Sequence, residues 1–204
     1  MGIQTRKARE REELRQKILD AAEKLFVEEG YANISMRKIA AIIEYSPTTI
    51  YSFFENKTEL LSTITAKSYK DLSERFEKIK AEKIDDSLVT LKSFIKEYIL
   101  YALEKPYNYE LFVTLCKLKI KDGTIYETIG DKRYKIFHSW LSLIAQGIEQ
   151  GKFKSSEPVS ILLLIWNTAH GFIMHRIKHP TLPWKSDEEE IAMLMDMMFN
   201  GLEK

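Results

Sequence analysis

The sequence predicts an all-α protein of about nine helices, in which an N-terminal three-helix head containing a helix-turn-helix precedes a larger helical bundle. Apolar residues recur at helical spacing along most of the chain, and the alternation typical of strands is almost never sustained. Ser, Asn and Asp stand repeatedly just before such apolar runs, where they would start helices. The chain has 204 residues, 45% of them hydrophobic, which is enough for one or two domains with a core.

The first helix carries an apolar stripe that ends at Gly30, a residue that stops helices. Residues 36–43 form a short second helix, and residues 44–46 form a turn. Ser46 then acts as N-cap and Pro47 as first residue of another short helix. The stripe of the first helix consists of Leu14, Ile18, Ala22, Leu25 and Phe26.

Six further helices account for the rest of the chain. Asn56 and Glu59 resemble a capping box and open a long helix that reaches Ile79. The other start and stop signals are Asp86, Pro106, Gly123, Gly151, Pro158, Pro180, Ser186 and Glu189. No Pro/Gly/Ser-rich linker separates two domains, so the long helix after Asn56 would have to join them.

The charges are unevenly distributed, although the formal net charge is only +1. Residues 1–17 carry six basic and three acidic residues, whereas residues 181–204 carry two basic and six acidic ones. The near-neutral total argues against a protein that coats nucleic acid by bulk charge. The basic start could meet a polyanion, and the alternative is a solvated helix face without a partner.

Cysteine content and the N-terminus predict the compartment. A single cysteine, Cys116, excludes an internal disulfide framework and a Cys-based zinc site, and it reads as a small buried hydrophobe. The first residues lack the apolar core of a signal peptide, and no run is long enough to span a membrane. We therefore expect a cytoplasmic protein with no membrane partner.

Residues 36–54 have the spacing of a helix-turn-helix, whose second helix enters the DNA major groove. Both helices are too short to be stable alone and would pack on the first helix. The inward residues are Ile39, Ala40, Ile43, Ile50 and Phe54. The residues expected to contact DNA are Arg37, Thr48, Thr49, Tyr51, Ser52, Phe53 and Lys57, with Arg37 and Lys38 near the phosphate track opposite to that of Lys57. The alternative is an ordinary helical hairpin with a wet polar face.

Residues of about 15–61 closely resemble the DNA-binding domain of TetR-family transcriptional regulators. The resemblance implies that Ser35 opens the second helix and belongs to the DNA-binding site. It implies that Thr48, Thr49, Ser52 and Phe53 lie on the recognition helix and that Tyr51 and Lys57 contact phosphates. The segments that carry it are 18–26, 29–31, 34–40, 46–51, Phe54 and 57–60.

The sequence departs from the family pattern at three positions. Glu44 stands in a turn where the family often has Ala-Gly-Val, so Glu44 must take a conformation that glycine adopts more easily. Thr48 stands where glycine is frequent, and Lys38 replaces a frequent acidic residue, so Ser35 lacks a capping-box partner. The DNA sequence preferences of other members therefore do not carry over directly.

The resemblance also implies a helical domain that binds a small-molecule effector and forms a homodimer. The domains would be residues 1–56, which bind double-stranded DNA, and residues 57–204, which bind the effector. An apolar or aromatic effector is expected, because the candidate pocket residues are Tyr98, Tyr101, Phe112, Phe137, Trp140, Trp166, Asn167 and His170. Asn167 and His170 would be its polar points. The alternative is that His170 is a satisfied core histidine and the aromatic rings are plain core.

The last helix carries an apolar stripe that predicts a dimer interface, with residues Ile191, Leu194, Met195, Met198 and Leu202. A two-fold dimer is what a palindromic operator requires. The alternative is that this stripe packs on its own bundle.

Metal binding and catalysis have little support in the sequence. His175 and His179 are four residues apart, as in half of a metal site, but no third ligand is in view. No phosphate-binding glycine loop, HExxH or nucleophile elbow is present. We therefore expect no metal, no cofactor and no enzyme activity, and a ligand-responsive repressor that binds a palindromic operator. The alternative function is a helical enzyme or small-ligand carrier whose short helices only pack.

Overall fold

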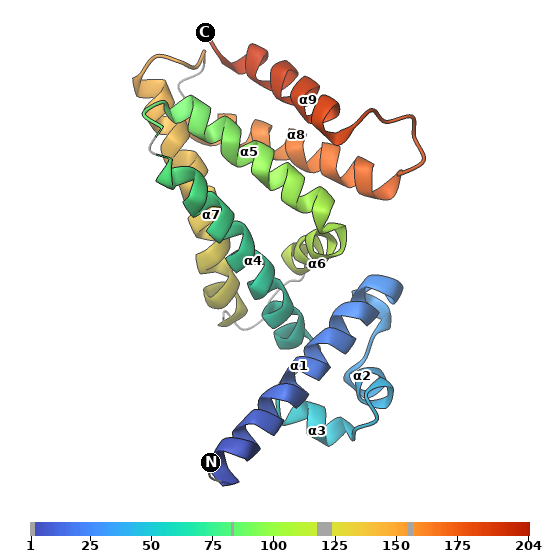
Figure 1. Cartoon of the computed structure of the whole chain (residues 1–204). Helices are drawn as coiled ribbons and strands as arrows, with labels where there is room; N and C mark the ends of the chain where they lie inside the picture. Colours follow the sequence, from blue (N-terminus) through green and yellow to red (C-terminus); the bar gives the residue numbers. More distant parts are fainter. Residues whose placement is uncertain (1–2, 83, 118–123, 155–156) are drawn as a thin grey trace. The chain divides into compact units, whose positions relative to one another are not determined.

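The computed structural model describes residues 3–82, 84–117, 124–154 and 157–204, and it describes only the backbone of residues 3–5, 112, 114–117 and 124–135. These residues form nine α-helices, one 3₁₀ helix and an isolated β-bridge (Figure 1). The predicted all-α fold is confirmed. The elements are α1 (Ile3–Glu29), η1 (Tyr31–Asn33), α2 (Met36–Ile42), α3 (Pro47–Tyr51), α4 (Lys57–Ala81), α5 (Ser87–Glu104), α6 (Pro106–Lys117), α7 (Thr124–Glu149), α8 (Pro158–Lys178) and α9 (Asp187–Leu202).

The described helices begin and end at or next to predicted signals, and the predicted stop at Gly123 lies outside the described residues. At five helix starts, a side-chain oxygen accepts a backbone N–H of the first turn, which satisfies a donor that the helix itself leaves unpaired. Glycines follow α1 and α7 with positive φ, at Gly30 (79°) and Gly151 (70°). The capping residues are Ser35, Ser46, Asn56, Asp86 and Ser186, the last in a complete capping box with Glu189.

The chain groups into two compact units, one of residues 1–68 and 107–129, the other of residues 69–106 and 130–204. Helix α4 passes from the first unit to the second. The division into residues 1–56 and 57–204 stays a prediction, because proximity does not show which segment folds independently. Within the described part of the chain, no helix is both long enough and apolar enough to cross a membrane.

The first unit has its core where α2 and α3 pack on α1. The five inward side chains that the sequence predicted are all buried, and so are Ile18, Ala22, Leu25 and Phe26 of α1. Ile39, Ala40 and Ile50 have no exposed surface. This arrangement confirms the helix-turn-helix packing, because the two short helices bury one face and leave the other in solvent.

The turn between α2 and α3 depends on Glu44. Its φ is 62°, in the left-handed region that side chains other than glycine rarely adopt. The turn is closed by the N–H of Tyr45, which donates to the carbonyl of Ala40 at 2.9 Å. The structure thus confirms that Glu44 takes a conformation favoured by glycine.

The second unit is built around a cluster of aromatic rings. Phe76 of α4 and Phe94 of α5 are stacked with centroids 4.5 Å apart. Trp140 of α7 lies 5.5 Å from Tyr98 and 5.8 Å from Trp166 of α8. Helix α5 contacts α8 and α9, which also contact each other. Large rings from four helices therefore fill the centre of this unit.

Polar contacts join α4 to α5 beside this cluster. The guanidinium of Arg75 donates to Glu97 at 3.0 Å and to Glu104 at 2.9 Å. Its central carbon lies 5.0 Å from the ring of Tyr101. Two carboxylates and an aromatic face hold one arginine in place, so the two helices keep a fixed register.

Asp86 joins the start of α5 to the residues after α7. Its carboxylate accepts the N–H groups of Leu88 at 2.9 Å and Val89 at 3.2 Å, and it forms an ion pair with Lys152. The hydrogen bond from Lys152 and those from the backbone hold the pKa of Asp86 below its ordinary value. The charged form is therefore favoured in the folded chain.

Replacing Asp86 by Asn removes the negative charge that pairs with Lys152 but keeps an oxygen that can cap α5. The amide oxygen can still cap α5, so we expect Asp86→Asn to lower the free energy of unfolding by less than about 1 kcal/mol at pH 7. Because the pKa of Asp86 is lowered on folding, its charge stabilises the protein above about pH 4, and this stabilisation is lost as the pH falls through the folded pKa. Urea unfolding from pH 7 to pH 3 should show the difference from wild type shrinking. Asp85→Asn, at the exposed neighbour, is the control, and a difference independent of pH would contradict the prediction.

Replacing Glu44 by Gly should stabilise the protein. Glycine adopts positive φ without steric cost, so we expect a gain of about 1 kcal/mol in the free energy of unfolding. The matched control is Glu55→Gly, also at an exposed residue but without a positive φ, which should give no gain. Chemical denaturation of the two variants checks this, and equal effects would show that the turn stores no strain.

Candidate nucleic-acid interface

Helix α3 presents one face to the core and the other to solvent. Its N-cap Ser46 and first residue Pro47 fix where the helix starts. Ile50 is fully buried, whereas Thr48 and Ser52 are exposed and 52% of the surface of Tyr51 is accessible. The structure therefore places three of the predicted contact residues on one open surface.

The hydroxyl groups of this surface have different local roles. The hydroxyls of Ser46 and Thr49 lie 2.9 Å apart, and the hydroxyl of Ser52 donates to the carbonyl of Thr49 at 2.7 Å. Within the described part, Thr48 and Tyr51 have no such hydrogen bond. Their polar ends can therefore bond to a partner without breaking a contact of the helix.

Phe53 is half-buried under an arginine of α1. The guanidinium carbon of Arg11 lies 4.8 Å from the centroid of the Phe53 ring, and its Nη2 donates to the carbonyl of Ser52 at 3.3 Å. Phe53 therefore supports Arg11 as well as bordering the open surface. Arg11 is not among the DNA contacts predicted from the sequence, although its spacing of seven residues from Ile18 could have placed it on this side of α1.

Helix α2 is held at its start by contacts with its flanking segments. The hydroxyl of Ser35 accepts the N–H of Lys38 at 3.2 Å, and the ammonium of Lys38 forms an ion pair with Glu29 at the end of α1. The lysine that replaces the usual acidic residue thus has a partner of its own. Arg37 is exposed beside it.

Lys57 is bound within the first unit. Its Nζ donates to the carbonyls of Tyr31 at 2.7 Å and Ile34 at 2.8 Å, and it lies 4.1 Å from the centroid of the Tyr31 ring. The hydroxyl of Tyr31 lies 3.0 Å from that of Thr58. Burial lowers the pKa of Lys57. The predicted phosphate contact thus also ties the first turn of α4 to the connection between α1 and α2, which leaves one N–H of the ammonium for another acceptor.

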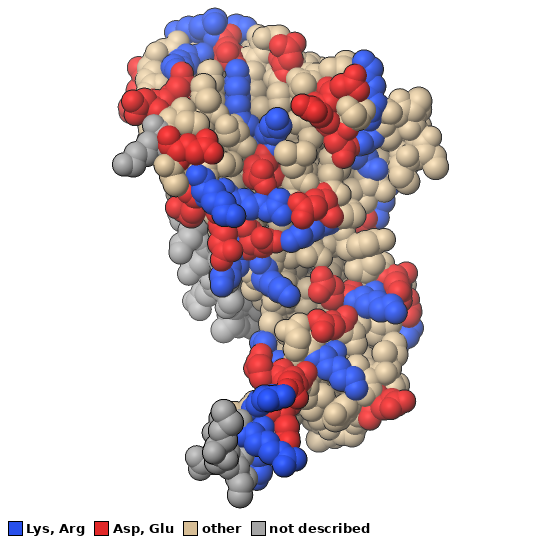
Figure 2. Space-filling model, viewed as in Figure 1, with Lys and Arg blue, Asp and Glu red and all other residues tan. Residues whose placement is uncertain are grey.

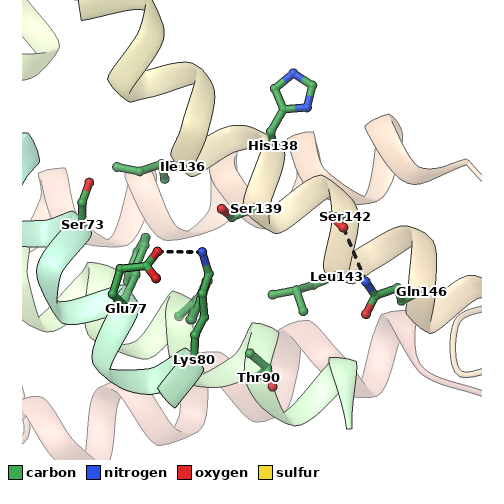
Figure 3. Close-up of a pocket in the computed structure, with 12 residues that line it drawn as sticks. Ser73, Glu77, Lys80, Thr90, Ile136, His138, Ser139, Ser142, Leu143 and Gln146 are labelled. Atoms are coloured by element: carbon green, nitrogen blue, oxygen red, sulfur yellow. Dashed lines mark hydrogen bonds and ion pairs between the residues drawn. The ribbon is translucent and has the colours of Figure 1, made fainter. Parts of the chain in front are cut away.

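An open groove of about 610 Å³ lies in the second unit between α4 and α7, with α5 at its base (Figure 3). The stacked rings of Phe76 and Phe94 contribute its apolar part. Serine, threonine and glutamine side chains line much of the rest, and Lys80 is paired with Glu77 at 2.8 Å. The polar lining residues are Ser73, Glu77, Lys80, Thr90, His138, Ser139, Ser142 and Gln146.

None of the predicted pocket residues whose side chains the structure describes lines this groove. Tyr98, Tyr101 and Trp140 are at most 5% exposed and belong to the aromatic core, so the structure favours plain core for these three. The predicted residues Phe137, Trp166 and His170 are half-buried, Asn167 is exposed, and the side chain of Phe112 lies outside the described part. Periodicity identified the apolar faces of these helices but did not show which faces border a hollow.

Trp140 carries a buried donor without a partner. Its ring is fully buried, and Nε1 makes no hydrogen bond to any described residue. A buried N–H without a partner costs about 1–3 kcal/mol. The ring lies 6.5 Å from that of Phe76, which lines the groove. A hydrogen-bond acceptor placed within reach of Nε1 of Trp140 would therefore stabilise the second unit.

Three of the predicted dimer residues pack within the chain. Ile191, Leu194 and Met198 are at most 8% exposed, so at these positions the structure favours the alternative that the stripe packs on its own unit. Met195 and Leu202 are half-buried. The exposed apolar residues of α9 are Met193 and Met197 instead.

The histidine pair of α8 is close in space but remains two residues. The rings of His175 and His179 have centroids 5.3 Å apart. Among the residues whose side chains are described, no group of three His, Cys, Asp or Glu could hold a metal ion. Cys116 lies outside those side chains.

Comparison with known proteins identifies the first unit. Residues 18–64 match the family described as bacterial regulatory proteins, tetR family. The HTH-type transcriptional regulator SAB2452 of Staphylococcus aureus is 30% identical over 62% of this chain and 69% of its own length. The uncharacterized HTH-type transcriptional regulator YhgD of Bacillus subtilis is 26% identical over 88% of this chain and 91% of its own.

A solved structure shows the same fold over nearly the whole chain. SmeT, the repressor of the Stenotrophomonas maltophilia multidrug efflux pump SmeDEF, has been solved in complex with triclosan. It has a TM-score of 0.66 at 19% identity and covers 93% of this chain and 91% of its own. Residues 18–64, which match the family, contain α2, the turn, α3 and the start of α4. The chain therefore belongs to the tetR family of bacterial regulatory proteins and is a DNA-binding transcriptional regulator.

Proposed function

We propose that this regulator is a repressor that binds a palindromic operator as a homodimer and leaves it when a small molecule binds. The observation that carries the proposal is the open face of α3, where Thr48 and Tyr51 project while Ile50 holds the helix to the core. The family and this surface favour a regulator over a helical enzyme or ligand carrier. Such a protein acts where the DNA lies, in the cytoplasm of a bacterial cell.

The proposed contacts divide into those that read bases and those that position the protein. The hydroxyl and methyl groups of Thr48 fit a base edge or a thymine methyl in the major groove. Tyr51, Arg37 and the remaining N–H of Lys57 are suited to phosphates. Thr49, Ser52 and Phe53 border this surface, and Ser35 lies at the start of α2.

The experiment that tests DNA binding uses Tyr51→Phe with labelled DNA from the gene's own upstream region. A hydrogen bond to a charged acceptor contributes about 1.5–3 kcal/mol, so we expect affinity to fall at least about tenfold on all sequences bound. The matched control is Tyr107→Phe, because Tyr107 is 58% exposed on α6 and lies outside the helix-turn-helix. No shift of any upstream fragment by wild type would overturn the regulator proposal, whereas equal affinities of the two variants would overturn only the role of Tyr51.

The proposed dimer interface is the exposed apolar face of α8 and α9. Leu163 and Leu164 of α8 are 47% and 57% exposed, and Met193 and Met197 of α9 are 57% and 66% exposed. Met193 and Met197 are four residues apart and therefore lie on one side of α9, whereas Leu163 and Leu164 are consecutive residues of α8. Helix α8 contacts α9. Val159, half exposed, continues this face one turn toward the start of α8. Large exposed apolar side chains grouped in this way are typical of an interaction surface.

The dimer proposal predicts the mass in solution. Wild type should elute with light-scattering mass twice the 23.9 kDa of the chain, and Leu164→Lys should give the monomer, because a charge cannot be buried there without a partner. The matched control is Leu182→Lys, at a leucine that is 48% exposed between α8 and α9. A Leu164→Lys variant that remains dimeric would show that the interface lies elsewhere.

The groove of the second unit is the proposed effector site. The Phe76 and Phe94 rings provide apolar surface, and the hydroxyls of Ser73, Thr90 and Ser142 provide hydrogen bonds, so we infer a ligand with an apolar body and polar substituents. That SmeT forms a complex with triclosan supports a small-molecule effector. Helix α4 both lines this groove and begins at Lys57, so a ligand that binds one position of α4 better than another could change the spacing of the two recognition helices.

A further inference from the structure

Helix α1 extends well beyond the core that it helps to form. It starts at Ile3, but the first buried residue among its described side chains is Ile18, and residues 6–13 are all exposed. In Figure 1 the N-terminal end of α1 projects past α3. An extension of this length contributes no apolar burial, so its sequence is free to serve another purpose.

One side of this extension carries basic residues, whereas the other side carries basic and acidic residues in pairs. Lys7, Arg11 and Arg15 are spaced by four residues, and this side of α1 continues into the buried side that begins at Ile18. Figure 2 shows Lys and Arg side chains beside acidic ones toward the N-terminal end of the chain. We call Lys7, Arg11 and Arg15 the basic stripe.

The opposite side of the extension is neutralised by ion pairs. Arg6 pairs with Glu10 and Arg9 with Glu13, each at 2.7 Å. Arg15 lies 3.9 Å from Glu12, but Lys7 and Arg11 have no ion pair among the described residues. The charge that remains unpaired on the extension is therefore positive and lies on the stripe.

Two residues of the basic stripe contact the C-terminal end of the recognition helix α3 and the residues just after it. Arg11 lies over Phe53 and donates to the carbonyl of Ser52, the C-cap of α3. The guanidinium carbon of Arg15 lies 5.3 Å from the ring of Phe54. These contacts set the direction of the stripe relative to α3, so a duplex bound by α3 would continue past it.

We propose that the basic stripe, chiefly Lys7 and Arg11, binds backbone phosphates of the operator just outside the base pairs read by α3. This inference rests on the proposed binding of α3 to DNA. Cationic side chains without carboxylate partners complement phosphates, and each such contact releases a counterion on binding. The stripe therefore raises affinity for all DNA and makes that affinity depend on salt.

The test measures the salt dependence of binding by full-length protein. The probe is a labelled duplex carrying the upstream region that wild type protects, with about one extra helical turn at each end. For Lys7→Ala/Arg11→Ala we expect the slope of log affinity against log salt to fall in magnitude by about 1.8 per bound chain. The ratio of wild-type affinity to variant affinity should therefore fall about tenfold per chain when the salt concentration rises from 50 to 200 mM. Hydroxyl-radical footprints should lose protection at the flanks and keep it at the centre.

The matched control is Arg6→Ala/Arg9→Ala, which removes the same charge from the other side of the same helix. We expect its slope to stay closer to wild type and its flanking protection to remain. Equal losses in both double variants would mean that only total charge matters and would overturn the proposal. A wild type that binds no fragment would instead overturn the proposed function itself.

A single-residue variant guards against a folding defect. Arg11→Ala also removes the contact with Phe53, so the double variant could loosen α3, which a lowered melting temperature would reveal. Lys7→Ala alone touches no such contact and should lower the slope by about 0.9 per chain. An unchanged slope in Lys7→Ala would overturn the role of Lys7, whatever the double variant does.

Discussion

The DNA-binding surface depends on the burial of the inner faces of α2 and α3 against α1. These helices have seven and five residues, far fewer than the roughly 12–15 that an isolated helix needs to be even marginally stable in water. Ile39 and Ile50 are fully buried, and Phe54 is 2% exposed. Because the same short helices carry the inner and outer residues, the position of Thr48 and Tyr51 is decided by side chains that never meet DNA.

Lys57 has two roles, because it is a predicted phosphate contact and it also holds the start of α4 to the rest of the first unit. Partial burial of an ammonium is unfavourable unless it is well bonded, and here two carbonyls accept hydrogen bonds from it and the Tyr31 ring lies against it. These contacts attach α4 to the connection that leads into α2. Movement of α4 would therefore act on the head through bonded atoms, and loss of Lys57 would leave two carbonyls to find other donors. A change in DNA affinity on removing this residue would combine a lost phosphate contact with a loosened head.

The sequence was informative where the physical cause is local. Ser35, Ser46 and Ser186 start helices through hydrogen bonds to residues three positions away, and Glu44 lies in a turn whose geometry needs positive φ. It could not show that Arg11 contacts Phe53, because that contact joins residues 42 positions apart. Nor could it distinguish a ring that packs on rings, such as Trp140, from one that borders a hollow, such as Phe76, since both have the same helical spacing. For the same reason, spacing did not distinguish the stripe of α9 that packs on its own unit from the exposed side that carries Met193 and Met197.

Electrostatic contacts and base contacts have separable consequences in this head. Phosphate contacts from the basic stripe would strengthen binding to every sequence equally, whereas Thr48 would discriminate among sequences. A regulator that bound DNA mainly through phosphate contacts would bind any chromosomal sequence. Its specificity for the operator therefore depends on a small unpaired positive charge. The glutamates that pair with Arg6 and Arg9 have this effect, since they leave only one side of α1 positive. The near-zero net charge of the chain is therefore compatible with DNA binding, because the position of the unpaired charge matters more than its total.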